Sequence, residues 1–146
     1  MPKYKLNLFK YKKGFSLIEL LVVVAIIGIL SAIGVVSYNG YVSGSKKTAA
    51  ENTIQQIALA QTEYYSNNGE YFLSGAGDTC TASATTSEDI EDELFAGENT
   101  IADDIDFEIC IFGSAATFTI RGEDQTGGST CVITLVRNGS PTRTDC

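Results

Sequence analysis

The chain has 146 residues, of which 44% are hydrophobic and 19% are charged, and its formal net charge at pH 7 is −8. This length is enough for one globular domain. An acidic chain is poorly suited to bind phosphate backbones or anionic membrane surfaces, and the absence of histidine argues against a zinc site.

The first 14 residues form a basic segment that ends at Gly14 and is followed at once by an apolar run. It contains half of the basic residues of the chain: Lys3, Lys5, Lys10, Lys12 and Lys13. We expect this basic side to stay cytoplasmic. No small-residue cleavage motif follows the apolar run before Tyr38, so the apolar run should survive processing, unlike a secretory signal. Without the basic segment, five basic residues remain against 18 acidic ones.

The apolar run from Phe15 to Val36 is long enough to cross a membrane. As a helix rising ~1.5 Å per residue, these 22 residues would cover about 33 Å, which matches a hydrocarbon core of ~30 Å. Its one charge is Glu19, and an ionised carboxylate in a bilayer costs up to a few kcal/mol. Glu19 therefore needs a partner, or it must lie near the headgroups or stay protonated.

The residues from Lys13 to Glu19 (KGFSLIE), together with the AIIGIL core that follows, closely resemble the leader and start of type IV prepilins. The resemblance implies cleavage between Gly14 and Phe15 by a prepilin peptidase and N-methylation of Phe15. It also implies that Phe15 and Glu19 serve assembly, with Glu19 of an incoming subunit neutralising the Phe15 amine of its neighbour. The family commonly has proline where this chain has Val36, so the chain departs from the pattern there.

The segment from Ser45 to Asn68 is amphipathic, with apolar residues at three- and four-residue spacing. We predict one long helix from Phe15 to about Asn67, half in the membrane and half against a globular head, ended by Asn68 and Gly69. The domains predicted are a leader, 1–14, that is removed; a transmembrane and assembly helix, 15–36; and an amphipathic helix that continues into the head, 37–146.

From Leu73 to Asp106 we predict no strand, only a short helix from Ser87 to Phe95 with Ser87 as its N-cap. Residues 88–108 hold ten acidic side chains and no basic one. A cation site is one interpretation, but no EF-hand spacing is present, and we favour a solvated, mutually repelling acidic face.

Three strands are predicted in the last third of the chain: Phe107 to Phe112, Ala116 to Arg121 and Thr130 to Arg137. Turn residues separate them, so we expect an antiparallel meander. The fold class is therefore α+β, a long N-terminal helix packed on a small antiparallel sheet. One sheet face should close over the helix at four positions: Ile54, Ile57, Ala58 and Tyr65.

The four cysteines lie beyond the apolar run and contain no Cys-x-x-Cys pair. In a translocated domain they indicate two disulfides, for which three connectivities are possible. The resemblance to pilins favours Cys131–Cys146, because many type IV pilins have a C-terminal disulfide region. The remaining pair is then Cys80–Cys110.

No catalytic constellation emerges, so we expect no enzyme, no cofactor and no metal. The leading function is a structural subunit of a type IV pilus whose filament supports adhesion, motility or DNA uptake. Two alternatives are a type II secretion pseudopilin and a minor pilin that acts as a tip ligand- or DNA-binding module. For that module, three basic side chains of the strand region would have to converge: Arg121, Arg137 and Arg143.

The expected partners are identical or related pilin subunits, the prepilin peptidase and methylase, the inner-membrane assembly platform and the membrane itself. Nucleic acid is not expected. The predicted location is the inner membrane before assembly and the extracellular pilus afterwards. The aromatic residues along the helix suggest either packing between subunits or electron transfer along a filament, and we favour packing.

Overall fold

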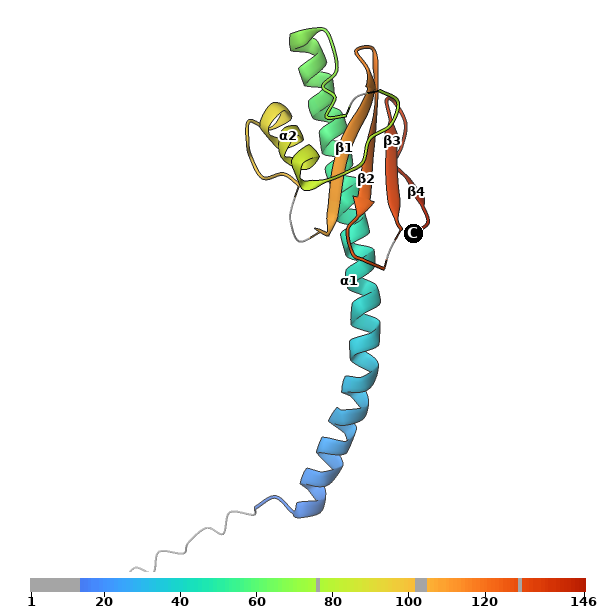
Figure 1. Ribbon diagram of the computed structural model, residues 1–146. Helices are drawn as coiled ribbons and strands as arrows, with labels where there is room; N and C mark the ends of the chain where they lie inside the picture. The colour runs from blue at the N-terminus through green and yellow to red at the C-terminus, as the bar shows by residue number, and fades with distance from the viewer. Residues whose placement is uncertain (1–13, 76, 102–104, 129) are drawn as a thin grey trace, which may run out of the picture. The chain divides into compact units, whose positions relative to one another are not determined.

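The computed structural model describes residues 14–75, 77–101, 105–128 and 130–146 (Figure 1). Its element order is α1 (Leu17–Asn68), α2 (Ala84–Leu94), β1 (Phe107–Ser114), β2 (Thr117–Asp124), β3 (Val132–Val136) and β4 (Thr142–Thr144). The chain forms two compact units, Met1–Gly40 and Tyr41–Cys146, and α1 belongs to both. We call the second unit the head.

Helix α1 has 52 residues and begins at Leu17, two residues later than predicted. The reason is a reciprocal cap. Glu19 N–H donates to Ser16 Oγ at 3.3 Å, and Ser16 N–H donates to Glu19 Oε2 at 2.7 Å. These bonds satisfy free N–H groups at the helix start. At the other end, Gly69 has φ +78° and donates its N–H to Tyr65 O at 2.9 Å, so the helix stops as predicted.

The head contains a four-stranded antiparallel sheet in the order β1-β2-β3-β4. Its inward face is built from rows of residues that pair across the first three strands. One row joins Ile111, Ile120 and Leu135, and the next joins Ile109, Gly122 and Ile133. The isoleucine and leucine side chains of both rows are buried. The predicted α+β class and the meander of strands are confirmed.

The head half of α1 closes over this sheet face. Ala50, Ile54 and Ile57 are fully buried, as the amphipathic pattern predicts. A Cβ added at Gly122 would lie 3.0 Å from Ile54 Cδ1, so glycine at this strand position allows the helix to lie close to the sheet. Tyr65 remains 41% exposed, and instead of entering the core it stacks on Tyr71 with ring centroids 4.5 Å apart.

Helix α2 begins at Ala84, and its N-cap is Ser83, not the predicted Ser87. Ser87 lies in the next turn, is buried, and serves the outer edge of β1. Its Oγ accepts a bond from Ile109 N–H at 3.0 Å, while Thr86 Oγ1 donates to Ile109 O at 2.8 Å. Helix α2 therefore covers an edge strand that would otherwise present unpaired backbone groups.

The strands are longer or shorter than predicted, and β4 was not predicted. Strand β2 was predicted to end at Arg121 but continues to Asp124, because Gly122 and Glu123 pair with both β1 and β3. Strand β3 stops at Val136. Strand β4 pairs with β3 through three residues, and all three of its side chains are exposed.

Candidate functional site

The processing segment predicted at Gly14 and Phe15 lies just before α1, in residues without helical structure. Phe15 is 90% exposed, and a Cβ added at Gly14 would meet no atom within 4 Å. The bond between these residues therefore lies outside the helix. The lysines of the predicted leader lie outside the described residues.

Glu19, predicted to serve assembly, is held by its own chain through the Ser16 cap described above. The Ser-x-x-Glu spacing is a capping-box signature that the sequence interpretation missed. Its carboxylate lies at the exposed start of α1, within four residues of Phe15. The predicted ion pair between Glu19 and the Phe15 amine of a neighbouring subunit would have to form between two molecules.

The first unit presents an apolar helical surface to its surroundings. Its large aliphatic side chains are about half exposed or more, from 82% at Leu17 to 49% at Val22 and Val23. Among the described residues, α1 is the helix that is long and apolar enough to cross a membrane. A contiguous exposed apolar surface of this size is typical of a segment that contacts lipid or another protein.

Both predicted disulfides are present in the head. Cys80 and Cys110 join the segment before α2 to β1, with Cα atoms 6.2 Å apart. Cys131 and Cys146 join the start of β3 to the end of the chain, with Cα atoms 4.4 Å apart. The second bond holds β4 against β3 and thereby fixes the edge of the sheet.

Four of the five basic residues of the head have separate hydrogen-bond or ion-pair partners. Lys46 pairs with Asp106, Arg121 Nε lies 2.5 Å from Glu123 Oε1, and Arg143 donates two bonds to Glu51 at 2.7 and 2.8 Å. The Arg143 bonds hold the pKa of Glu51 below its ordinary value. Lys47 donates to the carbonyl of Cys146 at 3.1 Å.

Arg137 differs from the other four cations. It donates to the carbonyl of Ala116 at 2.7 Å, and its guanidinium carbon lies 5.4 Å from the centre of the Tyr71 ring. Across the described part of the head, no carboxylate pairs with it. The three arginines that a DNA-binding module would need are therefore not brought together by ion pairing or shared partners.

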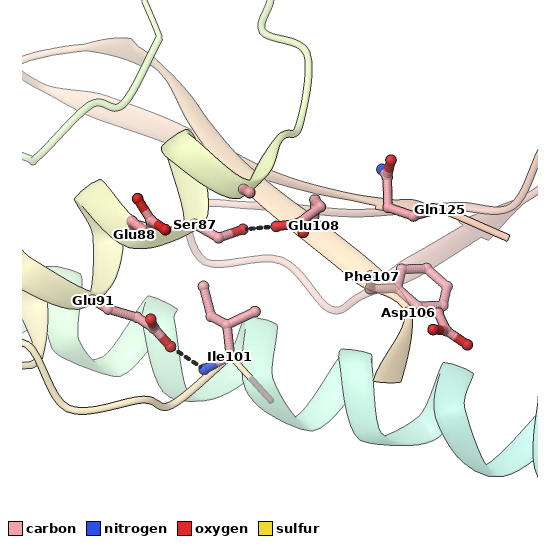
Figure 2. Close-up of a pocket in the computed structure, with 9 residues that line it drawn as sticks. Ser87, Glu88, Glu91, Ile101, Asp106, Phe107, Glu108 and Gln125 are labelled. Atoms are coloured by element: carbon pink, nitrogen blue, oxygen red, sulfur yellow. Dashed lines mark hydrogen bonds between the residues drawn. The ribbon is translucent and has the colours of Figure 1, made fainter. Parts of the chain in front are cut away.

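An acidic cleft of about 290 Å³ lies between α2, β1 and the loop after β2 (Figure 2). Four carboxylates line it: Glu88, Glu91, Asp106 and Glu108. Glu91 accepts bonds from the N–H groups of Thr100 and Ile101 at 2.7 and 2.6 Å, and Glu108 accepts one from Ser87. Within the described ranges, no three acidic, cysteine or histidine side chains are placed to hold a metal ion.

Two family models match the chain over most of its length. The model described as "Prokaryotic N-terminal methylation motif" matches residues 9–35, and the model described as "Type IV minor pilin ComP, DNA uptake sequence receptor" matches residues 36–135. The long helix with its exposed apolar half, the antiparallel sheet and the methylation motif together define a type IV pilin. Within that class, the chain belongs to the type IV minor pilin ComP, DNA uptake sequence receptor family.

Curated relatives are similar over shorter stretches. A fimbrial protein of Neisseria meningitidis serogroup B is 38% identical over 80 residues, 55% of this chain and 45% of the relative. The fimbrial protein EcpC of Eikenella corrodens is 48% identical over 58 residues, 40% of this chain and 38% of the relative. The major pilin PilE1 of Neisseria gonorrhoeae is 40% identical over 60 residues, 41% of this chain and 36% of the relative.

The chain thus spans less than half the length of these relatives. No solved structure matches it significantly. The pilin family to which the chain belongs consists of structural proteins.

Proposed function

We propose that this chain is a minor subunit of a type IV pilus and that it enters the filament through the apolar half of α1. The observation that carries the proposal is the helical surface from Leu17 to Val35, whose aliphatic side chains are exposed and whose one charged residue is Glu19. In the inner membrane lipid would cover this surface. In an extracellular filament the same surface would pack against other subunits, identical or related.

Maturation would require a prepilin peptidase to cut between Gly14 and Phe15 and a methylase to modify the new amine. The exposed, non-helical backbone at this bond supports the proposal, because a protease needs an extended substrate segment. Gly14→Val should leave full-length chain in the inner membrane, whereas Gly14→Ala, which adds only one small group, should be processed more completely. Mass spectrometry of the intact chain would measure both. A mature protein that begins at Met1, or beyond Val36, would rule out this maturation.

We also propose that Glu19 exchanges its bond to Ser16 N–H for the Phe15 amine of a neighbouring subunit during assembly. An opposite charge in an apolar surrounding is a better partner for a carboxylate than a neutral N–H. Glu19→Gln should therefore lower the amount of chain in sheared filaments, while the exposed Glu63→Gln should not. Equal amounts for the two variants would contradict the role of Glu19.

The finer role that we propose is DNA uptake, which the match of residues 36–135 to the ComP family supports. Deletion of the gene should lower transformation by added DNA while filaments remain visible on the cells. Loss of all filaments would indicate a major subunit instead. Unchanged transformation would contradict a role in DNA uptake, whatever happens to the filaments.

The charges of the head set an expectation for direct DNA binding. Outside the predicted leader five basic residues stand against 18 acidic ones, and three of the five are paired with carboxylates. Binding to unrelated duplex at physiological salt should therefore be weak, because sequence-independent affinity depends on cations that neutralise phosphates. Fluorescence anisotropy of the detergent-solubilised full chain, with unrelated duplex and with genomic fragments of the host, would measure this. Submicromolar binding to both, falling steeply with salt, would overturn the expectation.

A further inference from the structure

A groove of about 300 Å³ lies on the head between α1, the start of β2 and the end of β3. We call it the Arg137 groove. Buried apolar side chains form its base: Tyr71, Phe118 and Leu135. Leu59 borders the groove and is 73% exposed, the most exposed large aliphatic side chain of the described head. An isolated exposed leucine is ordinary on a protein surface, but a concave apolar site with a few polar groups at its edge is typical of a small-molecule site.

The cation at the edge of this groove, Arg137, is held in place by two contacts. Its Nη1 donates to the carbonyl of Ala116 at 2.7 Å, and its guanidinium carbon lies 5.4 Å from the centre of the Tyr71 ring. Tyr71 is itself fixed by Tyr65 and Phe118, with ring centroids 4.5 and 4.8 Å away. The guanidinium is therefore in position before a ligand arrives, which lowers the entropic cost of binding.

The turn that carries Arg137 is also fixed. The backbone N–H of Arg137 donates to the carbonyl of Phe118 at 3.0 Å, which ties the end of β3 to the start of β2. Two residues later, the N–H of Gly139 donates to the carbonyl of Val136 at 2.8 Å and closes the turn. The groove walls are thus held by backbone bonds, so the groove is preformed, as small-molecule sites usually are.

The charges around the groove favour an anion. Arg137 has no carboxylate partner among the described residues, and none of the described residues that line the groove is acidic. A guanidinium has five N–H donors, and the described head uses one of them, in the bond to Ala116. A carboxylate pairs with this planar fork through two parallel bonds, so one arginine is sufficient for it. The exposed side-chain amides of Gln55 and Asn138 add polar groups at the edge.

We infer that the Arg137 groove binds a small molecule with an apolar body and one carboxylate, the carboxylate on Arg137 and the body over Leu59 and Leu135. The groove volume is at the lower end of the ~300–1,000 Å³ range of small-molecule sites. DNA is a less favoured occupant, because one cation in an acidic head supplies little of the charge that a phosphate backbone requires. A protein surface is also less favoured, because a stable interface buries about 800 Å² on each side, whereas the α1 stretch along the groove, residues 55–62, is only ~10 Å long.

The first test is an NMR titration of the full chain, with isotope-labelled leucine methyl groups, in a non-ionic detergent. Phenylacetate should shift the methyl signals of Leu59 and Leu135 with a Kd in the millimolar range, as expected for about ten non-hydrogen atoms. Phenylacetamide has a similar shape but no charge, and acetate has no apolar body. Each of these two probes should bind at least about threefold more weakly than phenylacetate.

Three other leucines serve as internal controls for this titration. Leu94 borders a different pocket, between α1 and α2, and should not respond. Leu20 and Leu21 lie in the apolar half of α1 and report entry of the probe into the detergent. Shifts at these controls as large as those at Leu59, or equal binding of phenylacetate and phenylacetamide, would overturn the inference.

The second test removes the cation. In Arg137→Gln the preference for phenylacetate over phenylacetamide should disappear, because the charge of the probe no longer has a partner, whereas Arg137→Lys should retain most of it. Arg121→Gln removes a cation that pairs with Glu123 and does not line the groove, so it should leave the preference unchanged. A folded Arg137→Gln chain, with both disulfides formed, that still prefers phenylacetate would overturn the inference. If Arg137→Gln does not fold, the comparison of the three probes on the wild-type chain decides.

The inference does not depend on the proposed role in DNA uptake, and a duplex probe distinguishes the two. If duplex DNA shifts Leu59 and Leu135 and phenylacetate does not, the groove belongs to DNA and the inference fails, while the DNA-uptake proposal stands. If phenylacetate binds as expected but deletion of the gene leaves transformation unchanged, the DNA-uptake proposal fails and the groove assignment stands.

Discussion

Gln61 offers a direct test of how the head is held to α1. This side chain is fully buried and clamps the backbone of Phe72, donating Nε2–H to the carbonyl at 2.7 Å and accepting the N–H at 3.0 Å. Gln61→Ala leaves two backbone groups without partners, at a cost of about 1–3 kcal/mol each when they are buried. Since Phe72 is only partly buried, we expect a total loss of about 2–4 kcal/mol in the free energy of unfolding.

For a head of this size, that loss corresponds to a fall in Tm of roughly 8–16 °C. Near-ultraviolet circular dichroism of the tyrosines in the detergent-solubilised full chain would follow the melting of the head. Gln56→Ala, at an exposed position of the same helix, should change stability by less than about 0.5 kcal/mol. If Gln61→Ala melted within about 2 °C of that control, the clamp would not stabilise the head, and the reasoning from unsatisfied backbone groups would be wrong.

Three further changes follow from the structure. Replacing Cys131 and Cys146 together by serine removes a disulfide with a sequence separation of 15 and should lower the free energy of unfolding of the head by about 3 kcal/mol. The same melting experiment would measure this loss, and an unchanged Tm would contradict it. The pKa of Glu51 is lowered by Arg143, so its contribution to stability should be present above its ordinary value of 4.5 and be lost as the pH falls through the lower folded-state pKa. Melting of Glu51→Gln should therefore differ from that of the wild type at neutral pH and match it in acid, and a difference that persisted in acid would have another cause. Tyr41 is 76% exposed on α1, so Tyr41→Ala should reduce filament yield without changing the melting of the head; normal assembly with loss only of conductance would favour electron transfer over packing.

Patterns that depend on neighbouring residues were predictable from the sequence. The apolar run of α1, the spacing of Ile54 and Ile57, and the three longer strands follow from local periodicity, and the structure confirms them. The two disulfides are also confirmed, although their pairing was implied by the resemblance to pilins and not by periodicity.

Features set by distant contacts were not predictable. Ser83 and Ser87 are both good N-cap residues, and what decides between them is that Ser87 is needed at Ile109, in a strand about twenty residues later. Strand β4 has three polar, exposed residues and no strand pattern of its own; its place depends on pairing with β3 and on the disulfide of Cys146.

The site shows the same division. The segment at Gly14 and Phe15 is marked by a local motif, whereas the role of Gln61 gave no signal in the sequence. Gln61 continues the buried face of α1 at the spacing of Ile54 and Ile57, but a polar residue in that position reads as the edge of the apolar stripe. Its partner, the backbone of Phe72, lies beyond the end of the helix and cannot be identified from periodicity.

The glycines of α1 have a mechanical consequence for a filament under tension. A Cβ added at Gly28, Gly34, Gly40 or Gly44 would meet nothing within 4 Å, so no described part of the same chain packs closely against these glycines. Each of them nevertheless weakens the helix by ~1 kcal/mol relative to alanine. A pull along the axis should therefore unwind α1 first where they are densest. Extending the backbone between Gly34 and Gly44 from ~1.5 to ~3.3 Å per residue would lengthen each subunit by about 18 Å. Gly40→Ala should raise the force at which a filament held in optical tweezers begins to lengthen, and an unchanged force–extension curve would show that the glycines serve packing between subunits instead.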